Sequence, residues 1–169
     1  MAVRKVVSYP DPGLKTECVH VDGEGPLDGD MRELATDLLD TMGSFPGCVG
    51  IAAPQIGALV RMFAIDVIGH RRAKSCHGRL VLVNPVIIAR EGSCSMREGC
   101  LSIPDFTGNV HRAKRVTVGA RGVDGAALRL ECDAYEARVV LHELDHLDGL
   151  LFLDRVRSAK DVFPRKQYQ

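Results

Sequence analysis

The chain has 169 residues, in which 22 Lys and Arg balance 22 Asp and Glu, and 46% of the residues are hydrophobic. This length predicts one domain, residues 1–169, with a core of useful size. The charge balance argues against a protein that binds nucleic acid by neutralising many phosphates. With no Trp, three Tyr and five Phe, the chain also has few side chains on which bases could stack.

The six cysteines bear on the compartment in which the protein works. They are Cys18, Cys48, Cys76, Cys94, Cys100 and Cys132. A chain of this length and apolar content needs no disulfides to hold it together. The N-terminal MAVRKVVSYPDPG has no apolar run after its basic residues, and no stretch approaches the ~18 apolar residues of a membrane span. We therefore expect a cytoplasmic protein with mostly free thiols and no membrane partner.

The first predicted element is an N-terminal amphipathic helix near Asp30–Met42. Its apolar residues follow the spacing i, i+3, i+4, i+7, i+8 and i+11: Met31, Leu34, Ala35, Leu38, Leu39 and Met42. Asp30 followed by Glu33 resembles a capping box, and Gly43 is a typical stop signal. This single stripe predicts that one face of the helix is buried.

The middle of the chain is predicted to form strands. Three segments are rich in β-branched and aliphatic residues: Leu59–Val67, Leu80–Val83 and Val86–Ala89. Asn84-Pro85 is expected to separate the last two, and the polar segment His70–Gly78 to form a loop. Further along, Arg115–Ala120 and Leu128–Asp133 predict a hairpin around the turn RGVDG.

A second helix is predicted near Ala134–Leu147, with Asp133 as its N-cap and Gly149 as its stop signal. Its apolar residues lie all round the axis, which is typical of a helix inside a core: Val139, Val140, Leu141, Leu144 and Leu147. We therefore predict an α+β fold in which mixed or antiparallel strands pack around this buried C-terminal helix.

This core helix contains His142-Glu143-Leu144-Asp145-His146, an HExxH motif. Residues four apart lie on one helical face, so His142 and His146 can bind the same metal ion. Glu143 projects roughly 100° round the helix from His142, beside an open position of that ion. There it can take a proton from water and return it to a leaving amine. A chance match is disfavoured because burying these polar side chains without partners would be costly.

Two histidines leave such a metal ion short of one protein ligand. Downstream, the sequence LDGLLFLDRV contains no His and no Glu. The third ligand is therefore expected upstream, among the cysteines and the remaining histidines. Two upstream segments stand out, because Cys100 lies in a turn-like context and Gln55 is the one polar residue in the apolar run GCVGIAAPQIG.

Three segments together resemble the peptide deformylases. Members of that family carry, in order, a GφGφAAPQ segment, an EGCLS segment and an HExDH segment. Here the matching residues are Cys48–Gln55 (CVGIAAPQ), Glu98–Ser102 (EGCLS) and His142–His146 (HELDH), in the same order. The resemblance covers the chain from end to end and includes the tail LFLDRV after the third motif.

The metal ligands implied by the resemblance are Cys100, His142 and His146, with Glu143 as general acid and base. The implied reaction is hydrolysis of the formyl amide of N-formylmethionyl peptides, which releases formate and a free amino terminus. The cofactor would be one divalent metal ion, Fe2+ in the cell, with Zn2+, Ni2+ or Co2+ as alternatives. The substrates would be nascent chains in the bacterial cytoplasm, near the ribosome exit region.

Other matched residues would act on the substrate or support the ligands. The resemblance implies that the Gln55 side chain and the backbone N–H of Leu101 stabilise the oxyanion. Backbone groups of Gly50 would hold the substrate in an extended pose. Glu98 matches a carboxylate outside the ligand set, and Arg112 matches the arginine that pairs with it.

The sequence departs from the family pattern at three positions. Cys48 stands where glycine is usual, and Leu141 where glutamine is usual. Neither position should carry chemistry, so we expect altered packing there. Thr107 stands where many bacterial members have an arginine that contacts the substrate backbone, which bears on peptide affinity and not on the reaction class.

The spacing along the core helix predicts a substrate pocket. Tyr135 and Val139 share a helical face with the two histidines of the motif. We expect them to line the cavity for the methionine side chain, together with Val49 and Met96.

Two other functions are compatible with the motifs. An HExxH metallopeptidase would need a downstream Glu or His ligand, and none is present. A non-catalytic metal-binding or peptide-binding module would have no use for Glu143 and Gln55. A thiol-rich structural zinc site is disfavoured because the sequence has no CxxC pair.

Overall fold

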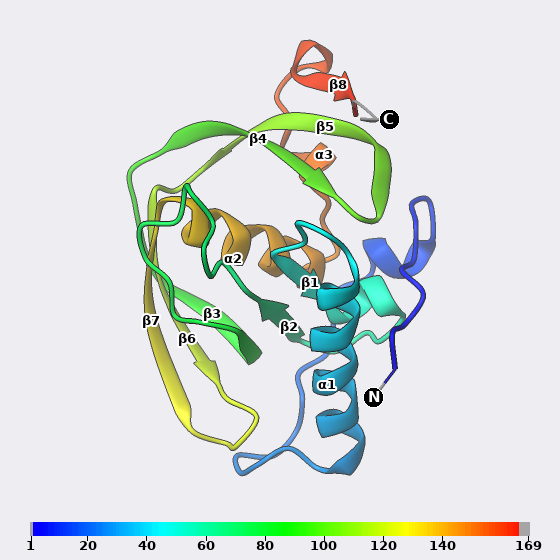
Figure 1. The fold of residues 1–169 in the computed structure, drawn as a ribbon, viewed down its shortest axis with the longest axis vertical. Coiled ribbons are helices and arrows are strands. Elements are labelled where there is room, and N and C mark those ends of the chain that lie inside the picture. The colour runs from blue at the N-terminus through cyan, green and yellow to red at the C-terminus, as the bar shows by residue number, and fades with distance from the viewer. Residues whose placement is uncertain (1, 166–169) are drawn as a thin grey trace.

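The computed structural model describes residues 2–165 and has the α+β class expected from the sequence (Figure 1). Short 3-10 helices occupy Pro12–Lys15, Ala53–Ile56 and Ala159–Asp161. The α-helices and strands are, in chain order, α1 (Gly29–Ser44), β1 (Gly50–Ala52), β2 (Met62–Ile65), β3 (Leu80–Glu91), β4 (Cys94–Cys100), β5 (Ile103–Arg112), β6 (Arg115–Arg121), β7 (Ala127–Asp133), α2 (Ala134–Leu147), α3 (Phe152–Arg155) and β8 (Val162–Pro164).

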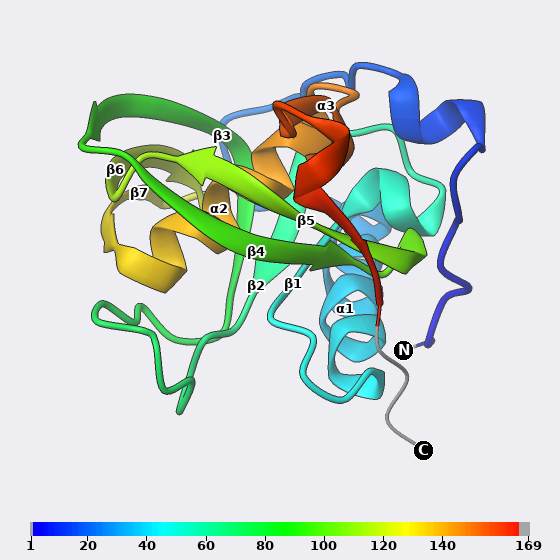
Figure 2. The same cartoon turned by 90° about the horizontal axis from the view of Figure 1, so that it is seen from above.

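The strands form two sheets, with α2 between them (Figures 1 and 2). The larger sheet has the order β1-β2-β3-β6-β7, and the smaller one the order β4-β5-β8, with antiparallel pairing throughout these ladders. Helix α1 packs on the face of β1 and β2 that lies away from α2. Within residues 2–165, no helix combines the length and apolar character needed to cross a membrane.

Strand β2 explains why both helices are held against the larger sheet. Successive side chains of a strand point to opposite faces. Met62 and Ala64 pack in the cluster with α1, whereas Phe63 and Ile65 pack in the cluster with α2. All four residues are fully buried. Burying a large apolar side chain contributes about 1.5–3 kcal/mol, so β2 stabilises both helices.

The N-cap of helix α1 lies two residues before the predicted cap, Asp30. The N-cap is Asp28, whose side chain accepts a hydrogen bond from the backbone N–H of Met31 at 2.8 Å. Asp30, the predicted cap, instead lies in the first turn, where a negative charge favours the helix dipole. The predicted stop at Gly43 was also wrong, because Gly43 continues the helix and the C-cap is Phe45.

Strand β3 runs through the predicted break at Asn84-Pro85, so the expectation of two separate strands was wrong. The pairing of β3 with β6 shifts register between Val83 and Val86, which marks a bulge. A bulge tolerates a proline without a ladder hydrogen bond. The Asn84 side chain makes two hydrogen bonds of 2.8 Å with the backbone of Val21, which holds this bulge in place.

The predicted strand Leu59–Val67 is shorter in the structure and covers Met62–Ile65. The first residues of the predicted strand form backbone hydrogen bonds with Val19, which lies outside the named strands. The Val19 N–H donates to the Leu59 carbonyl at 3.0 Å, and the Arg61 N–H donates to the Val19 carbonyl at 2.8 Å. The hairpin of β6 and β7, in contrast, agrees with the prediction to within a residue at each end.

Helix α2 is fixed at both of its ends. The N-cap Asp133 accepts a hydrogen bond from the backbone N–H of Ala134 at 2.6 Å. Beyond the C-cap Asp148, Gly149 takes a left-handed conformation with φ of 69°. A Cβ on Gly149 would lie 2.9 Å from the backbone of Lys15, so a side chain here would collide with the N-terminal segment.

Buried charged side chains join α2 to the smaller sheet. Glu98 on β4 accepts hydrogen bonds from Arg112 Nε at 2.6 Å and Arg112 Nη2 at 2.9 Å, and it also pairs with Arg138 on α2. Arg112 Nη1 donates to Asp145 at 2.8 Å, and Arg155 donates to the other Asp145 oxygen at 2.7 Å. Buried charges are tolerated only when they are paired and hydrogen-bonded. This network therefore fixes how α2 lies against β4 and β5.

The network gives a stability prediction. The substitution Glu98→Gln should lower the free energy of unfolding by about 3–5 kcal/mol, because Arg112 and Arg138 would be left buried without a full counter-charge. Urea unfolding followed by circular dichroism measures this. The control is Glu91→Gln, which breaks an exposed ion pair with Arg115 and should cost less than about 1 kcal/mol. Equal losses in the two variants would contradict the prediction.

Candidate active site

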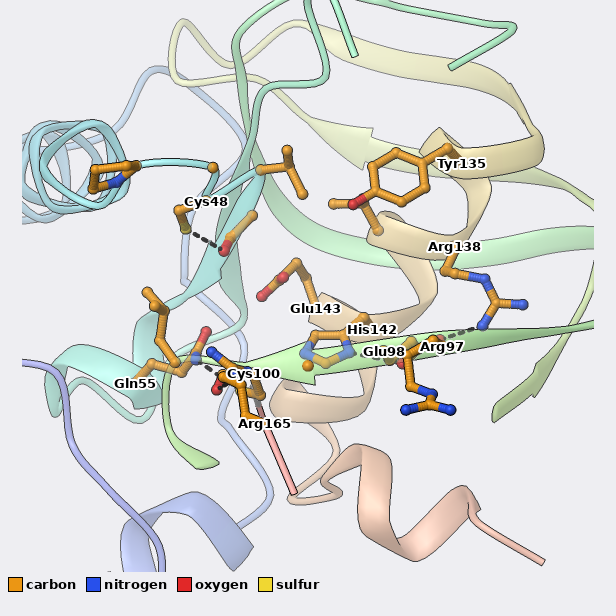
Figure 3. A pocket seen from close by; sticks show the side chains of 17 residues that line it. Cys48, Gln55, Arg97, Glu98, Cys100, Tyr135, Arg138, His142, Glu143 and Arg165 are labelled. Atoms are coloured by element: carbon orange, nitrogen blue, oxygen red, sulfur yellow. Dashed lines mark hydrogen bonds and ion pairs between the residues drawn. The ribbon is translucent and has the colours of Figure 1, made fainter. Parts of the chain in front are cut away.

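The predicted metal ligands come together between α2 and the end of β4. Figure 3 shows two of them, Cys100 and His142. His142 and His146 lie one turn apart on α2, and Cys100 is the last residue of β4. The ligand atoms of these three residues all lie within 4.8 Å of one another. Cys100 Sγ is 3.2 Å from His146 Nε2. The fold thus brings Cys100 to the two histidines, where the helix alone offers no third candidate ligand.

The orientation of the His142 ring is set by a carboxylate. His142 Nδ1 lies 2.9 Å from Glu98 Oε2, and because a carboxylate is an acceptor, this nitrogen is the one that carries the proton. The other ring nitrogen, Nε2, is then free to bind a metal ion. Burial by itself would raise the pKa of Glu98, but hydrogen bonds from His142 and Arg112 hold it below its usual range.

The Cys100 thiol has a different ionisation from other buried cysteines. Burial would raise its pKa, but the neighbouring His146 and His142 side chains hold it well below the usual value. Burial instead raises the pKa of Cys18 and Cys48 to about 11 and that of Cys132 to about 12. The thiolate is the form that binds metals, so Cys100 is suited to be a ligand.

These donors fit a divalent transition metal. A thiolate and two imidazoles are ligands that Fe2+, Zn2+, Co2+ and Ni2+ accept. Three protein ligands also leave a position open, which is typical of catalytic metal sites and not of structural ones. Arg112 holds the Glu98 carboxylate, and Glu98 in turn holds the His142 ring. Residues outside a ligand set commonly orient the ligands in this way.

Glu143 is buried next to this group and faces strand β1. A Cβ on Gly50 would lie 2.5 Å from Glu143 Oε1 and 2.9 Å from Val139 Cγ1, so only glycine leaves room for the carboxylate. Burial raises the pKa of Glu143 to about 7, although His142 and His146 act to lower it. Oxygen Oε2 has no hydrogen-bond partner within the described chain. Such a carboxylate can exchange protons near neutral pH.

Gln55 is held with its amide donor toward the ligands. It lies in the 3-10 helix that follows β1, and the Ala52 N–H donates to its Oε1 at 2.9 Å. Its Nε2 therefore faces Cys100 Sγ at 3.4 Å and Ser102 Oγ at 3.2 Å. Only 2% of Gln55 is exposed, so the amide cannot turn freely. A fixed donor at this place can stabilise negative charge that develops next to the ligands.

A cavity of about 300 Å³ opens over these groups. The structure brings nearly all the predicted site residues to it: Val49, Gly50, Gln55, Cys100, Leu101, Tyr135, Val139, His142 and Glu143. His146 lies behind the cavity, buried against Cys100.

Met96 does not line the cavity, so its placement there was wrong. It lies half-buried on β4, opposite Val110 on β5. Arg138 reaches from α2 to the carbonyl groups of Cys94 and Val110 at 3.0 and 3.1 Å. Arg138, and not Met96, therefore lines the cavity here.

Sequence reasoning gave no role at the site to seven of the lining residues: Pro46, Gly47, Cys48, Arg97, Gly99, Arg138 and Arg165. Arg138 had a usable signal, because it precedes His142 by one turn on a helix that was predicted to lie in the core. Cys48 was expected only to alter packing. In the structure it lines the cavity, and its thiol lies 3.2 Å from the Gly50 carbonyl oxygen. Arg165 follows β8 near the end of the chain, and no local pattern connects it to the motifs.

A second group of ligand-type side chains lies at the start of α2. It consists of His77, Cys132 and Glu136. Both oxygens of the fully buried Glu136 already accept hydrogen bonds, one from the His77 N–H at 2.8 Å and the other from Ser75 Oγ and His77 Nδ1. These hydrogen bonds hold the loop before β3 against α2. They explain why the three side chains lie together without the need for a metal ion.

Comparisons with known proteins show similarity to one family over nearly the whole chain. A family model described as polypeptide deformylase matches residues 3–162. A peptide deformylase from Syntrophobacter fumaroxidans is 35% identical over 98% of this chain and 94% of its own length. The crystal structure of a peptide deformylase from Legionella pneumophila gives a TM-score of 0.84 at 35% identity, over 94% of this chain and 89% of that one. A Met-Ala-Ser-bound class I type b peptide deformylase from Acinetobacter baumannii gives 0.83 at 31% identity, over 92% of this chain and 99% of that one. The chain therefore belongs to the polypeptide deformylase family.

Proposed function

We propose that Cys100, His142 and His146 hold the divalent metal ion with which this deformylase removes the N-formyl group from new polypeptides. The observation that carries this assignment is their convergence to within 4.8 Å beside a cavity that also contains Glu143. When bound, such an ion supplies Lewis acidity, which makes water more acidic and a carbonyl carbon more electrophilic. Fe2+ is the ion that we propose for the cell, with Zn2+, Ni2+ and Co2+ as substitutes that the same donors accept.

Glu143 moves the protons in this proposal. Its carboxylate accepts a proton from the attacking water as the new C–O bond forms at the formyl carbon. When the C–N bond breaks, Glu143 donates that proton to the leaving nitrogen, so that formate and a free amine result. A pKa of about 7 suits a group that must both take and give a proton near neutral pH.

Gln55 and Leu101 stabilise the charge that forms between these two steps. The Gln55 Nε2 and the backbone N–H of Leu101 donate to the oxygen that becomes negative in the tetrahedral intermediate. Because the Ala52 N–H holds Gln55 Oε1, the amide donates without first reorganising. One such donor is worth about 3 kcal/mol in the transition state.

The substrate lies along the cavity in an extended conformation. Backbone groups of Gly50 on β1 hold the peptide, and Val49, Tyr135 and Val139 surround the methionine side chain. The relative from Acinetobacter baumannii with Met-Ala-Ser bound supports a peptide of this kind as the ligand. We further propose that residues 1–169 act as one catalytic domain in the bacterial cytoplasm, on nascent chains near the ribosome exit.

The role of Glu143 can be tested by Glu143→Gln. This variant should keep its metal ion, because Glu143 is outside the ligand set, but should lose at least about 100-fold in kcat, since general acid–base catalysis contributes that much or more. The measurement is deformylation of formyl-Met-Ala in anaerobic buffer, with metal analysis of the same preparation.

Cys100→Ala is the complementary variant and should lose bound metal together with activity. Glu131→Gln, which changes an exposed carboxylate on β7, serves as the control with normal activity and metal content. Appreciable turnover by Glu143→Gln would remove Glu143 from the mechanism, and a full metal complement in Cys100→Ala would remove Cys100 from the ligand set.

The pocket can be tested by Val139→Phe. A larger side chain on the cavity wall should exclude methionine more than alanine, so the ratio of kcat/KM for formyl-Met-Ala to that for formyl-Ala-Ala should fall about 10-fold, the value of one poorly fitted apolar contact. Steady-state kinetics on both peptides measure the ratio. An unchanged ratio would show that Val139 belongs to the core and does not contact the methionine side chain.

A further inference from the structure

We propose that Arg165 is a substrate-binding residue whose guanidinium donates to a backbone carbonyl of the peptide beyond the formylmethionyl residue. This inference rests on the proposed function, because it takes the cavity over Cys100 and His142 as the place where the peptide binds. It adds a residue from the end of the chain to a site otherwise made by the three motif segments.

The backbone next to Arg165 is held by the same sheet that carries Cys100. Strand β8 pairs with β5, and the Arg165 N–H continues this ladder by donating to the Asp105 carbonyl at 2.8 Å. The Arg97 guanidinium on β4 lies 3.5 Å above the Phe163 ring of β8. Cation–π contacts of this kind add attraction to the strand pairing. Arg165 is therefore positioned by ordered structure on both β4 and β5.

The side chain of Arg165 then crosses β4 toward the cavity. Its Nη2 donates to the Cys100 carbonyl at 3.1 Å, and Figure 3 draws it beside Cys100 at the cavity rim. The path runs over Gly99, where a Cβ would collide with the guanidinium. Thr107 on β5 borders the same spot, because its Cγ2 would lie 3.4 Å from that Cβ. Glycine at position 99 thus leaves the room that the guanidinium occupies.

The guanidinium has donors to spare at this place. An arginine carries five N–H donors, and the contact with Cys100 uses one of them. Its Nε is buried without a hydrogen-bond partner in residues 2–165, and in the same range no carboxylate forms an ion pair with it. A buried donor left without an acceptor is destabilising, because it has lost its hydrogen bonds to water. An incoming acceptor is therefore favoured.

The position along the cavity indicates which part of the substrate supplies that acceptor. The reacting formyl group must lie by Cys100 and Glu143, and the methionine side chain by Val139 on α2. Arg165 contacts β4 at the Cys100 carbonyl, and in this proposal the peptide leaves the cavity on this side. Extended residues advance about 3.3 Å each, so the next backbone carbonyls pass over this rim. A cationic donor binds such oxygens about twice as strongly as a neutral one.

The test uses Arg165→Ala in the metal-loaded, full-length enzyme. Two substrates are compared, formyl-Met-Ala-Ser amide and formyl-Met amide, of which only the first has carbonyls beyond the formylmethionyl residue. The ratio of their kcat/KM values should fall about tenfold in the variant, through KM of the longer substrate. Affinity for the product Met-Ala-Ser amide, measured by calorimetry, should weaken by a similar factor. Arg157→Ala, an exposed arginine of the same segment, is the matched control.

Other results would overturn the inference. An equal loss on both substrates, mainly in kcat, would mean that Arg165 only braces the Cys100 carbonyl. No change on either would mean that it is an ordinary surface residue. A loss seen with free-acid peptides but not with amides would assign Arg165 to the terminal carboxylate instead. If the unmodified enzyme deformylated neither substrate, the proposed function itself would be wrong. That outcome differs from every result above, because those results concern only the difference between the variant and the unmodified enzyme.

Discussion

The Glu98 carboxylate is the contact on which the rest of the site depends. It lies on β4 between two buried arginines, and its second oxygen binds the His142 ring. The cost of burying this charge is offset only if β4, β5 and α2 meet in one arrangement. That arrangement places Cys100, two residues further along β4, against His146. The pairing that stabilises the fold thus also sets the geometry of the proposed ligands.

The opposite wall of the site depends on close approach of backbone. Glycine at position 50 lets β1 pass directly over Glu143, which removes the carboxylate from water and raises its pKa. Immediately after β1, a short 3-10 helix turns Gln55 back so that its amide faces Cys100. The segment from Gly50 to Gln55 therefore supplies both the backbone that lies over Glu143 and the fixed amide donor. In this way the apolar segment GCVGIAAPQIG serves the chemistry through its backbone.

Local patterns predicted what depends on helical spacing. The stripe of α1, the extent of α2 and the shared face of His142 and His146 all follow from the 3.6-residue period, and the structure has them at those residues. The predicted interruption of a strand at a proline was wrong. Asn84-Pro85 lies within a strand because a bulge, held by Val21, removes the need for the missing N–H. Met96 was placed in the cavity wall, but in the structure it lies opposite Val110 on β5, and Arg138 of α2 is a lining residue instead.

The sequence by itself indicated the reaction class through its resemblance to a known family, and it located the three motifs because each one is a short contiguous segment. It left open how the segments meet and what else borders the cavity. Thr107 on β5 is the departure from the family pattern that bears on peptide affinity, and the structure brings the Arg165 guanidinium next to it. Only tertiary structure decides such a contact. Strand pairing between β8 and β5 joins residues about sixty positions apart, and local sequence carries no trace of it.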